Sequence, residues 1–156
     1  MLKLTPQQFA VIVEQGRQGK PLEICGLLAG RRQSSNQSTL DGSASIVEAV
    51  FPIDSEDKSE VTYSMNPLQQ LRVEKDVRAR GLEIVGIYHT HPATQPYPSK
   101  TDVARAHWGD TDDLLFPEYS YLIVSLRDVE NPEPRSYKIR GRQIPHDIVE
   151  EPVVIE

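Results

Sequence analysis

The sequence predicts an α/β or α+β fold in which one mixed β-sheet is flanked by about three helices. Three separate stretches carry helix-capping signals, and short apolar runs with β-branched or aromatic residues lie between them. The expected order along the chain is helix, strands, helix, strand, helix, strands. A length of 156 residues suits one compact domain and is enough to bury a hydrophobic core.

The helices are predicted from their first turns. Thr5 is followed by Pro6 and Gln8, which is the pattern of an N-cap, a first-turn proline and a capping-box glutamine. The apolar residues that follow recur at helical spacing. Asn66 begins a second such pattern, and Ser99 begins a third. The expected helices run from Thr5 to Gly19, from Asn66 to Gly81 and from Ser99 to near Gly109.

Strands are expected where short apolar runs are bounded by turn residues. The polar stretch Gln33–Thr39 is expected to form an exposed loop. The proline-rich stretch from about Asn131 onward is expected to be irregular, with one strand. The predicted strands are Ile24–Arg31, Ala44–Ile53, Glu83–His91, Tyr119–Leu126 and Ser136–Arg140, with a further short strand at Val61–Ser64.

Composition and charge exclude several classes of protein. Lysine and arginine total 17 against 23 acidic residues, a net charge of −6, so neither nucleic acid nor an anionic membrane is an expected partner. The single cysteine, Cys25, excludes an intrachain disulfide scaffold. No apolar run approaches the roughly 20 residues of a membrane-spanning helix, and the N-terminal residues lack a signal-peptide pattern. A cytoplasmic protein is therefore expected.

A candidate metal site lies at the end of the predicted strand Glu83–His91. His89 and His91 are two residues apart, so their imidazoles leave the strand on the same face. Neutral imidazole nitrogens suit zinc, and a later aspartate, Asp102, would complete a three-ligand site with a fourth position for water. That is the arrangement of a catalytic zinc site. The structural alternative is that Ser99 and Asp102 simply form a helix-capping box.

The His-Thr-His motif, followed by Ser99 and Asp102 at their spacing here, resembles the signature of the JAMM (MPN+) metalloprotease family, in its small prokaryotic type. That family also places a glutamate ahead of an apolar strand, and Glu23 stands in such a segment, PLEICGLLAG. The resemblance implies a zinc ion (Zn²⁺) and assigns every one of these polar residues a role. His89, His91 and Asp102 would be the zinc ligands, Glu23 the general acid/base, and Ser99 the residue that helps to stabilise the tetrahedral intermediate.

The resemblance extends from about Thr5 to Leu126 and implies the MPN fold, a cytidine-deaminase-like α/β arrangement with a curved mixed sheet. It makes residues 1–130 the catalytic domain, and residues 131–156 a C-terminal strand and proline-rich tail of the same domain. The implied activity is that of a zinc-dependent metallo(iso)peptidase. Its zinc-activated water would hydrolyse a peptide or isopeptide bond at the C-terminal Gly-Gly tail of a ubiquitin-like or sulfur-carrier protein.

Two short segments bear on the substrate that the resemblance implies. Asp54–Asn66 and Val103–Tyr119 are shorter than the insertions with which the large ubiquitin-trimming members grip two ubiquitins. Cleavage of a specific polyubiquitin linkage is therefore disfavoured. The chain resembles the small free-standing members of the family more closely. That resemblance implies as substrate a prokaryotic sulfur carrier that bears a C-terminal extension or an amino-acid adduct.

The same residues allow other interpretations. Relatives without metal ligands serve as scaffolds or protein-binding modules, but here all five polar positions are filled. Two histidines and a carboxylate also bind iron in oxygenases, although a closely spaced histidine pair fits zinc hydrolysis better. A nucleotide deaminase normally relies on cysteine ligands, and Cys25 is alone. A nucleophilic cysteine needs an electropositive, partly exposed setting, whereas Cys25 lies in an apolar run where burial is expected.

Overall fold

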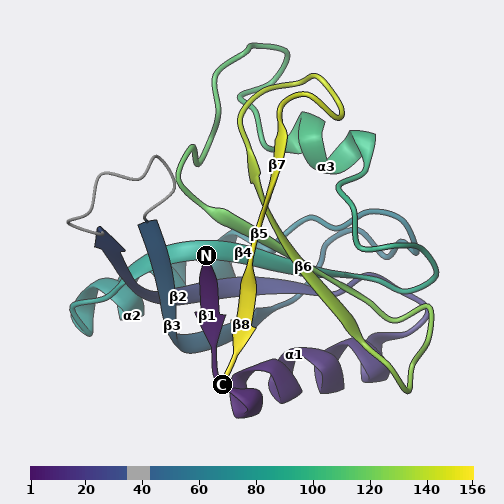
Figure 1. Ribbon diagram of the computed structural model, residues 1–156, viewed down its shortest axis with the longest axis horizontal. Coiled ribbons are helices and arrows are strands. Elements are labelled where there is room, and N and C mark those ends of the chain that lie inside the picture. The colour runs from purple at the N-terminus through teal and green to yellow at the C-terminus, as the bar shows by residue number, and fades with distance from the viewer. Residues whose placement is uncertain (35–42) are drawn as a thin grey trace.

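The computed structural model describes residues 1–34 and 43–156 and has a mixed α/β architecture (Figure 1). Most of the stretch Gln33–Thr39, expected to be a loop, lies outside the described residues, and its first two residues continue a strand. None of the described helices has the length and hydrophobicity that crossing a membrane requires. The helices are α1 (Pro6–Gly19), α2 (Pro67–Ala79) and α3 (Lys100–Arg105). The strands are β1 (Leu2–Leu4), β2 (Cys25–Ser34), β3 (Ser43–Ile53), β4 (Glu83–His91), β5 (Ser120–Ser125), β6 (Glu133–Ile139), β7 (Ile148–Glu151) and β8 (Val153–Ile155).

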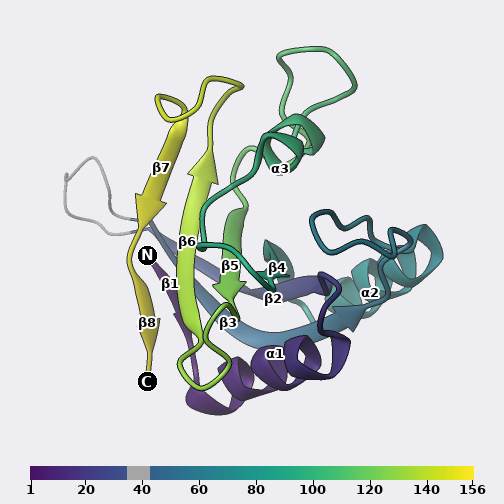
Figure 2. The same cartoon turned by 90° about the vertical axis from the view of Figure 1, so that its right-hand side faces the viewer.

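The strands of the described chain form one eight-stranded sheet in the order β7-β6-β5-β4-β2-β3-β1-β8. The pairs β4–β5, β1–β3 and β1–β8 are parallel, and the other neighbours are antiparallel. Only Pro152 separates β7 from β8, yet β7 pairs with β6 at one edge and β8 pairs with β1 at the other. The C-terminal segment therefore links the two edges of a curved mixed sheet (Figure 2), which confirms the predicted fold class.

The helices cover both faces of the sheet. Successive residues of a strand point to opposite faces, and each face has its own apolar core. Leu28 of β2 and Tyr88 of β4 pack with residues of α1 in one core, whereas Leu27 and Ile87 pack with residues of α2 and α3 in the other. Residues of β4 that alternate with Tyr88 therefore face α2 and α3.

The three predicted helices are present, but the second and third end earlier than expected. α2 ends before Gly81, whose φ of +69° is a left-handed conformation that terminates a helix. α3 ends at Arg105 rather than near Gly109. The chain turns away there, because His107 pairs with Leu114 in an isolated β-bridge and Gly109 adopts a positive φ of 48°.

The four predicted central strands are confirmed, and the errors lie elsewhere. The prediction of a short strand at Val61–Ser64 is wrong. The N–H groups of Val61 and Thr62 donate to the hydroxyl of Ser59 instead of to a neighbouring strand. The proline-rich tail contains three strands, β6, β7 and β8, instead of one. β1, which has three residues, is not predicted from the sequence.

Candidate metal centre

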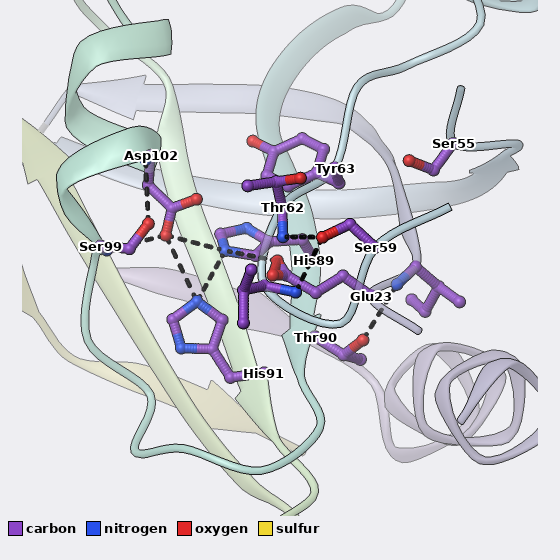
Figure 3. A network of polar contacts seen from close by, with 12 residues as sticks. Glu23, Ser55, Ser59, Thr62, Tyr63, His89, Thr90, His91, Ser99 and Asp102 are labelled. Atoms are coloured by element: carbon purple, nitrogen blue, oxygen red, sulfur yellow. Dashed lines mark hydrogen bonds and ion pairs between the residues drawn. The ribbon is translucent and has the colours of Figure 1, made fainter. Parts of the chain in front are cut away.

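His89 and His91 lie at the end of β4, and both side chains point to the face that α3 covers (Figure 3). Thr90, between them, points to the opposite face, where a Cβ added at Gly16 of α1 would lie 2.8 Å from its methyl group. All three side chains are buried. Because β4 is an inner strand, paired with β2 and β5 on its two sides, the histidine pair has a rigid support.

Asp102 reaches the same place from the first turn of α3. Ser99 caps that helix: its Oγ accepts the Asp102 N–H at 3.0 Å, and its own N–H donates to Asp102 Oδ2 at 2.9 Å. The same Oδ2 lies 3.2 Å from His89 Nε2 and 3.3 Å from His91 Nε2. One carboxylate oxygen therefore completes the capping box and also faces both imidazoles.

The three facing atoms have the mutual spacing of ligands around one zinc ion. His89 Nε2 and His91 Nε2 are 3.1 Å apart, and Asp102 Oδ2 is 3.2 and 3.3 Å from them. Donors at about 2.0–2.1 Å from a tetrahedral zinc ion lie about 3.3 Å from one another. Two imidazole nitrogens and one carboxylate oxygen are also the donor types that zinc accepts in catalytic sites. The residues present therefore fit the ion.

The hydrogen bonds of the rings also favour a cation at this point. His91 Nδ1 lies 2.8 Å from the backbone carbonyl of Gln95, so Nδ1 carries the proton. In neutral His91 the Nε2 lone pair then faces the carboxylate of Asp102 and the ring of His89. Buried lone pairs that face one another repel, and a shared metal ion or an additional proton relieves that repulsion.

Glu23 approaches the centre from the connection between α1 and β2. Its backbone N–H donates to the carbonyl of Ser59 at 2.9 Å. The next residue, Ile24, exchanges two hydrogen bonds of 3.1 Å with Thr90, which ties this connection to the end of β4. The Glu23 carboxyl is thereby held beside the histidines by main-chain contacts on both sides.

The Glu23 carboxyl lies beside the His89, His91 and Asp102 side chains but farther from them than they are from one another. Its Oε1 is 3.9 Å from His89 Nε2, and one donor atom of each of Glu23, His89, His91 and Asp102 falls within 4.8 Å of the others. That oxygen is buried and has no hydrogen-bond partner among the described residues. A buried, unpartnered carboxyl oxygen at this distance is suited to receive a proton from a small molecule in the centre.

Burial and charge give the two carboxyl groups opposite properties. Burial raises the pKa of Glu23 to about 8, and the charge of Asp102 adds to the effect. Burial alone would also raise the pKa of Asp102, but His89, His91 and the Ser99 N–H hold it well below its usual range. Against the effect of burial, the hydrogen bond to Asp102 raises the pKa of His91. One carboxyl can therefore exchange a proton near neutral pH while the other stays ionised.

Cys25 does not have the properties of a nucleophile. Its side chain is fully buried, and Sγ contacts the carbonyl of Ile53 at 3.5 Å. Burial raises the pKa of the thiol to about 12, with Asp54 and Glu23 adding to the effect. The thiol is therefore protonated at neutral pH, which argues against the cysteine-protease interpretation.

Three residues that support the centre are not identified by the sequence analysis. Gln95 and Ser59 contribute main-chain carbonyls, which every residue carries, so no sequence signal distinguishes them. Tyr63 stacks on the His89 imidazole, with ring centroids 4.5 Å apart and an interplanar angle of 28°. Its β-branched neighbours Val61 and Thr62 could only suggest a strand.

Comparison with protein-family models matches residues 5–140 to the prokaryotic homologs of the JAB domain. The CysO-cysteine peptidase of Mycobacterium tuberculosis is 33% identical over 142 residues, which cover 91% of this chain and 82% of that protein. The desampylase of Haloferax volcanii is 33% identical over 119 residues, which cover 73% of each chain. A solution structure of a protein from Desulfitobacterium hafniense matches with a TM-score of 0.79 and 33% identity, covering 100% of this chain and 93% of that one.

These similarities agree with the family and the enzyme class that the sequence predicts. The family match covers most of the chain, and the fold agrees with that of a solved structure of similar length. The named relatives are a peptidase and a desampylase, which confirms the prediction of a hydrolase. The chain belongs to the prokaryotic homologs of the JAB domain, the small prokaryotic type of the JAMM (MPN+) family.

Proposed function

We propose that this protein is a zinc-dependent metallo(iso)peptidase that cleaves at the C-terminal Gly-Gly tail of a ubiquitin-like or sulfur-carrier protein. The observation that carries the proposal is the convergence of His89 Nε2, His91 Nε2 and Asp102 Oδ2 at 3.1–3.3 Å from one another. The Glu23 carboxyl, with a pKa of about 8, stands beside them. Three ligands and one adjacent proton-transfer group are the minimum that metal-assisted hydrolysis needs.

The residues divide into those that hold the ion and those that handle protons. His89, His91 and Asp102 would hold the zinc ion, which would supply Lewis acidity for the attacking water and for the scissile carbonyl. Glu23 takes a proton from the attacking water and delivers it to the leaving amine as the C–N bond breaks. A group that must both accept and return a proton works best with a pKa near neutrality, and in the metal-free protein burial raises the pKa of Glu23 to about 8.

Ser99 is the second proposed catalytic residue. Its Oγ accepts the Asp102 N–H in the helix cap, which leaves the hydroxyl proton free to donate. A donor beside Asp102 is well placed to bond to the oxygen that becomes negative when water adds to the carbonyl. Removing one such donor typically lowers kcat by about 100- to 1,000-fold.

The substrate class follows from the relatives together with the site. One named relative is a CysO-cysteine peptidase and another is a desampylase, so small protein tails and their conjugates are the natural candidates. We place the reaction in the cytoplasm. We also treat residues 1–130 as the catalytic part and residues 131–156 as belonging to the same domain, which the pairing of β6 with β5 and of β8 with β1 supports.

Metal analysis combined with a cleavage assay tests the proposal. The purified chain is analysed for bound metals, then incubated with zinc and a small Gly-Gly-ending protein that carries one extra C-terminal amino acid, and the products are weighed. We expect about one zinc per chain and release of the added residue. Asp102→Ala should lose zinc and cleavage, whereas Glu23→Gln should keep zinc and lose cleavage.

Glu60→Gln is the matched control, because Glu60 is an exposed glutamate in the segment that contacts Glu23. It should keep both zinc and activity. A chain that binds the substrate without zinc and leaves it intact would instead be a scaffold or binding module. A chain that binds iron in preference to zinc would point to the oxygenase type of two-histidine, one-carboxylate site.

A further inference from the structure

The orientations of the two histidine rings of the centre are fixed by different contacts. His91 Nδ1 donates to the carbonyl of Gln95, which fixes the orientation of that ring. His89 Nδ1 is buried and has no hydrogen-bond partner among the described residues. Metal-binding histidines usually owe their ring orientation to a hydrogen bond at the second nitrogen. The orientation of His89 therefore depends on packing.

Tyr63 supplies that packing. Its ring is stacked on the His89 imidazole, with centroids 4.5 Å apart and planes inclined by 28° (Figure 3). Stacked aromatic rings are a favoured arrangement, and a flat neighbour at this distance prevents the imidazole from rotating out of its plane. The side chain of Tyr63 is partly buried in the core that lies beneath α2 and α3.

Arg105 ties the backbone of Tyr63 to α3. Its Nη1 donates to the Tyr63 carbonyl and to Asp57 Oδ2, both at 2.6 Å. Arg105 stands three residues after Asp102, so both side chains belong to the same short helix. The contact therefore connects the helix that carries one proposed ligand to the residue whose ring supports another.

The connection between β3 and α2, residues 54–66, contains both partners of Arg105 and is braced internally. Asp57 Oδ2 also accepts from Thr62 Oγ1 at 2.9 Å, next to Tyr63. The Ser59 carbonyl in the same connection accepts the N–H of Glu23. Fixing this connection on α3 therefore affects the surroundings of His89 and of the proposed general base together.

We propose that Arg105, Asp57 and Tyr63 are positioning residues for the metal centre. The Arg105–Asp57 pair holds the 54–66 connection on α3, and Tyr63 thereby orients the ring of His89. The inference rests on the proposed function, since it concerns the ion which that function requires. Beyond that function, it states that side chains which do not bind zinc themselves determine how tightly the ion is held.

A simple effect of charge leads to a different expectation. Arg105 is positive, so its neutralisation would make the centre more attractive to a cation, whereas neutralising Asp57 would make it less attractive. If the ion pair between Arg105 and Asp57 holds residues 54–66 on α3, neutralising either residue breaks that contact, and both changes weaken zinc binding. The direction of the change in Arg105→Gln therefore separates positioning from charge.

The test is the zinc affinity of the full chain, measured by competition with a chromophoric chelator. We expect Arg105→Gln, Asp57→Asn and Tyr63→Leu each to bind zinc roughly tenfold more weakly than the wild type, as is typical for residues that orient metal ligands. Tyr63→Phe keeps the ring and should bind as the wild type does. The double variant of Arg105 and Asp57 should lose no more affinity than either single variant. The absorption bands of the Co²⁺-loaded protein should shift in the same variants.

Arg31→Gln provides a matched control. Arg31 is also a largely exposed arginine that bonds to one carboxylate and one carbonyl, those of Glu48 and Gly81. It should leave zinc affinity unchanged, and thermal unfolding verifies that each variant is folded. If Arg105→Gln, Asp57→Asn and Tyr63→Leu bind zinc as tightly as the wild type, or if Arg105→Gln binds it more tightly, the inference is overturned and the proposed function still stands. A wild-type chain that binds no zinc overturns both.

Discussion

Glu23 is expected to make the stability of the metal-free protein depend on pH, and Glu23→Gln to remove that dependence. The residue is 3% exposed, and burial together with the charge of Asp102 raises its pKa from 4.5 to about 8. The folded protein therefore keeps a proton that the unfolded chain has already released. The stabilising contribution is fully present below the unfolded pKa and is lost as the pH rises through the folded pKa.

The size of the effect follows from the two pKa values. One pKa unit corresponds to about 1.4 kcal/mol. Between pH 5 and pH 8, the titration of Glu23 alone should lower the free energy of unfolding by about 3 kcal/mol. Glutamine has nearly the shape of a protonated glutamic acid and does not titrate. His91, whose pKa is also raised, is present in both proteins, so the part of its contribution that does not come from the charge of Glu23 cancels in the comparison.

Urea denaturation of chelator-treated wild-type and Glu23→Gln proteins, followed by circular dichroism at pH 5, 6.5 and 8, measures this difference. The free energy of unfolding of the wild type should fall more steeply with pH than that of the variant. Parallel pH profiles would show that the carboxyl is not desolvated in the folded state. Glu23 would then not be a group that exchanges protons near neutral pH.

Three further predictions concern other positions. Ser99→Ala should remove the side-chain cap of α3 and lower the free energy of unfolding by about 1 kcal/mol. A catalytic role of the hydroxyl predicts in addition that kcat falls by at least about 100-fold while the zinc content is unchanged. Gly26→Ala should destabilise the protein by about 1–3 kcal/mol in thermal unfolding, because the new Cβ would lie 2.3 Å from the Tyr88 ring. The pKa of Glu151 lies below its usual range although burial opposes this, because the Ser120 hydroxyl, the charge of Lys138 and the Ser136 hydroxyl, which donates at 2.7 Å, stabilise the carboxylate. Its stabilising contribution is lost as the pH falls, so Glu151→Gln should flatten the acid-unfolding profile.

The inner elements of the fold are predictable from sequence because their signals are local. The hydrogen bonds between Thr5 and Gln8 that start α1 join residues three apart in the chain. The outer strands depend on partners far away in the sequence: Leu2 of β1 pairs with Val153 of β8. A strand of three residues has too few side chains to show a period, so β1 and β8 emerge only from the folded chain.

The site divides in the same way. Alternation along a strand predicts that His89 and His91 share a face, and the structure places them so. Glu23 is identified only through the family resemblance, since a glutamate before a strand is ordinarily a solvated residue. The contributions of Tyr63 and Gln95 come from a ring stack and a main-chain carbonyl, and neither leaves a recognisable pattern.

The two interpretations of the Ser99–Asp102 motif are complementary rather than competing. A carboxylate oxygen has two lone pairs, and Asp102 Oδ2 uses one direction for the Ser99 N–H while it faces both histidines. The cap thus fixes the rotamer that a metal ligand needs. α3 has six residues, too few to be stable on its own, so it depends on such end contacts. An ion held by Asp102 would stabilise the start of this helix, and the helix in turn keeps the carboxylate in place for the ion.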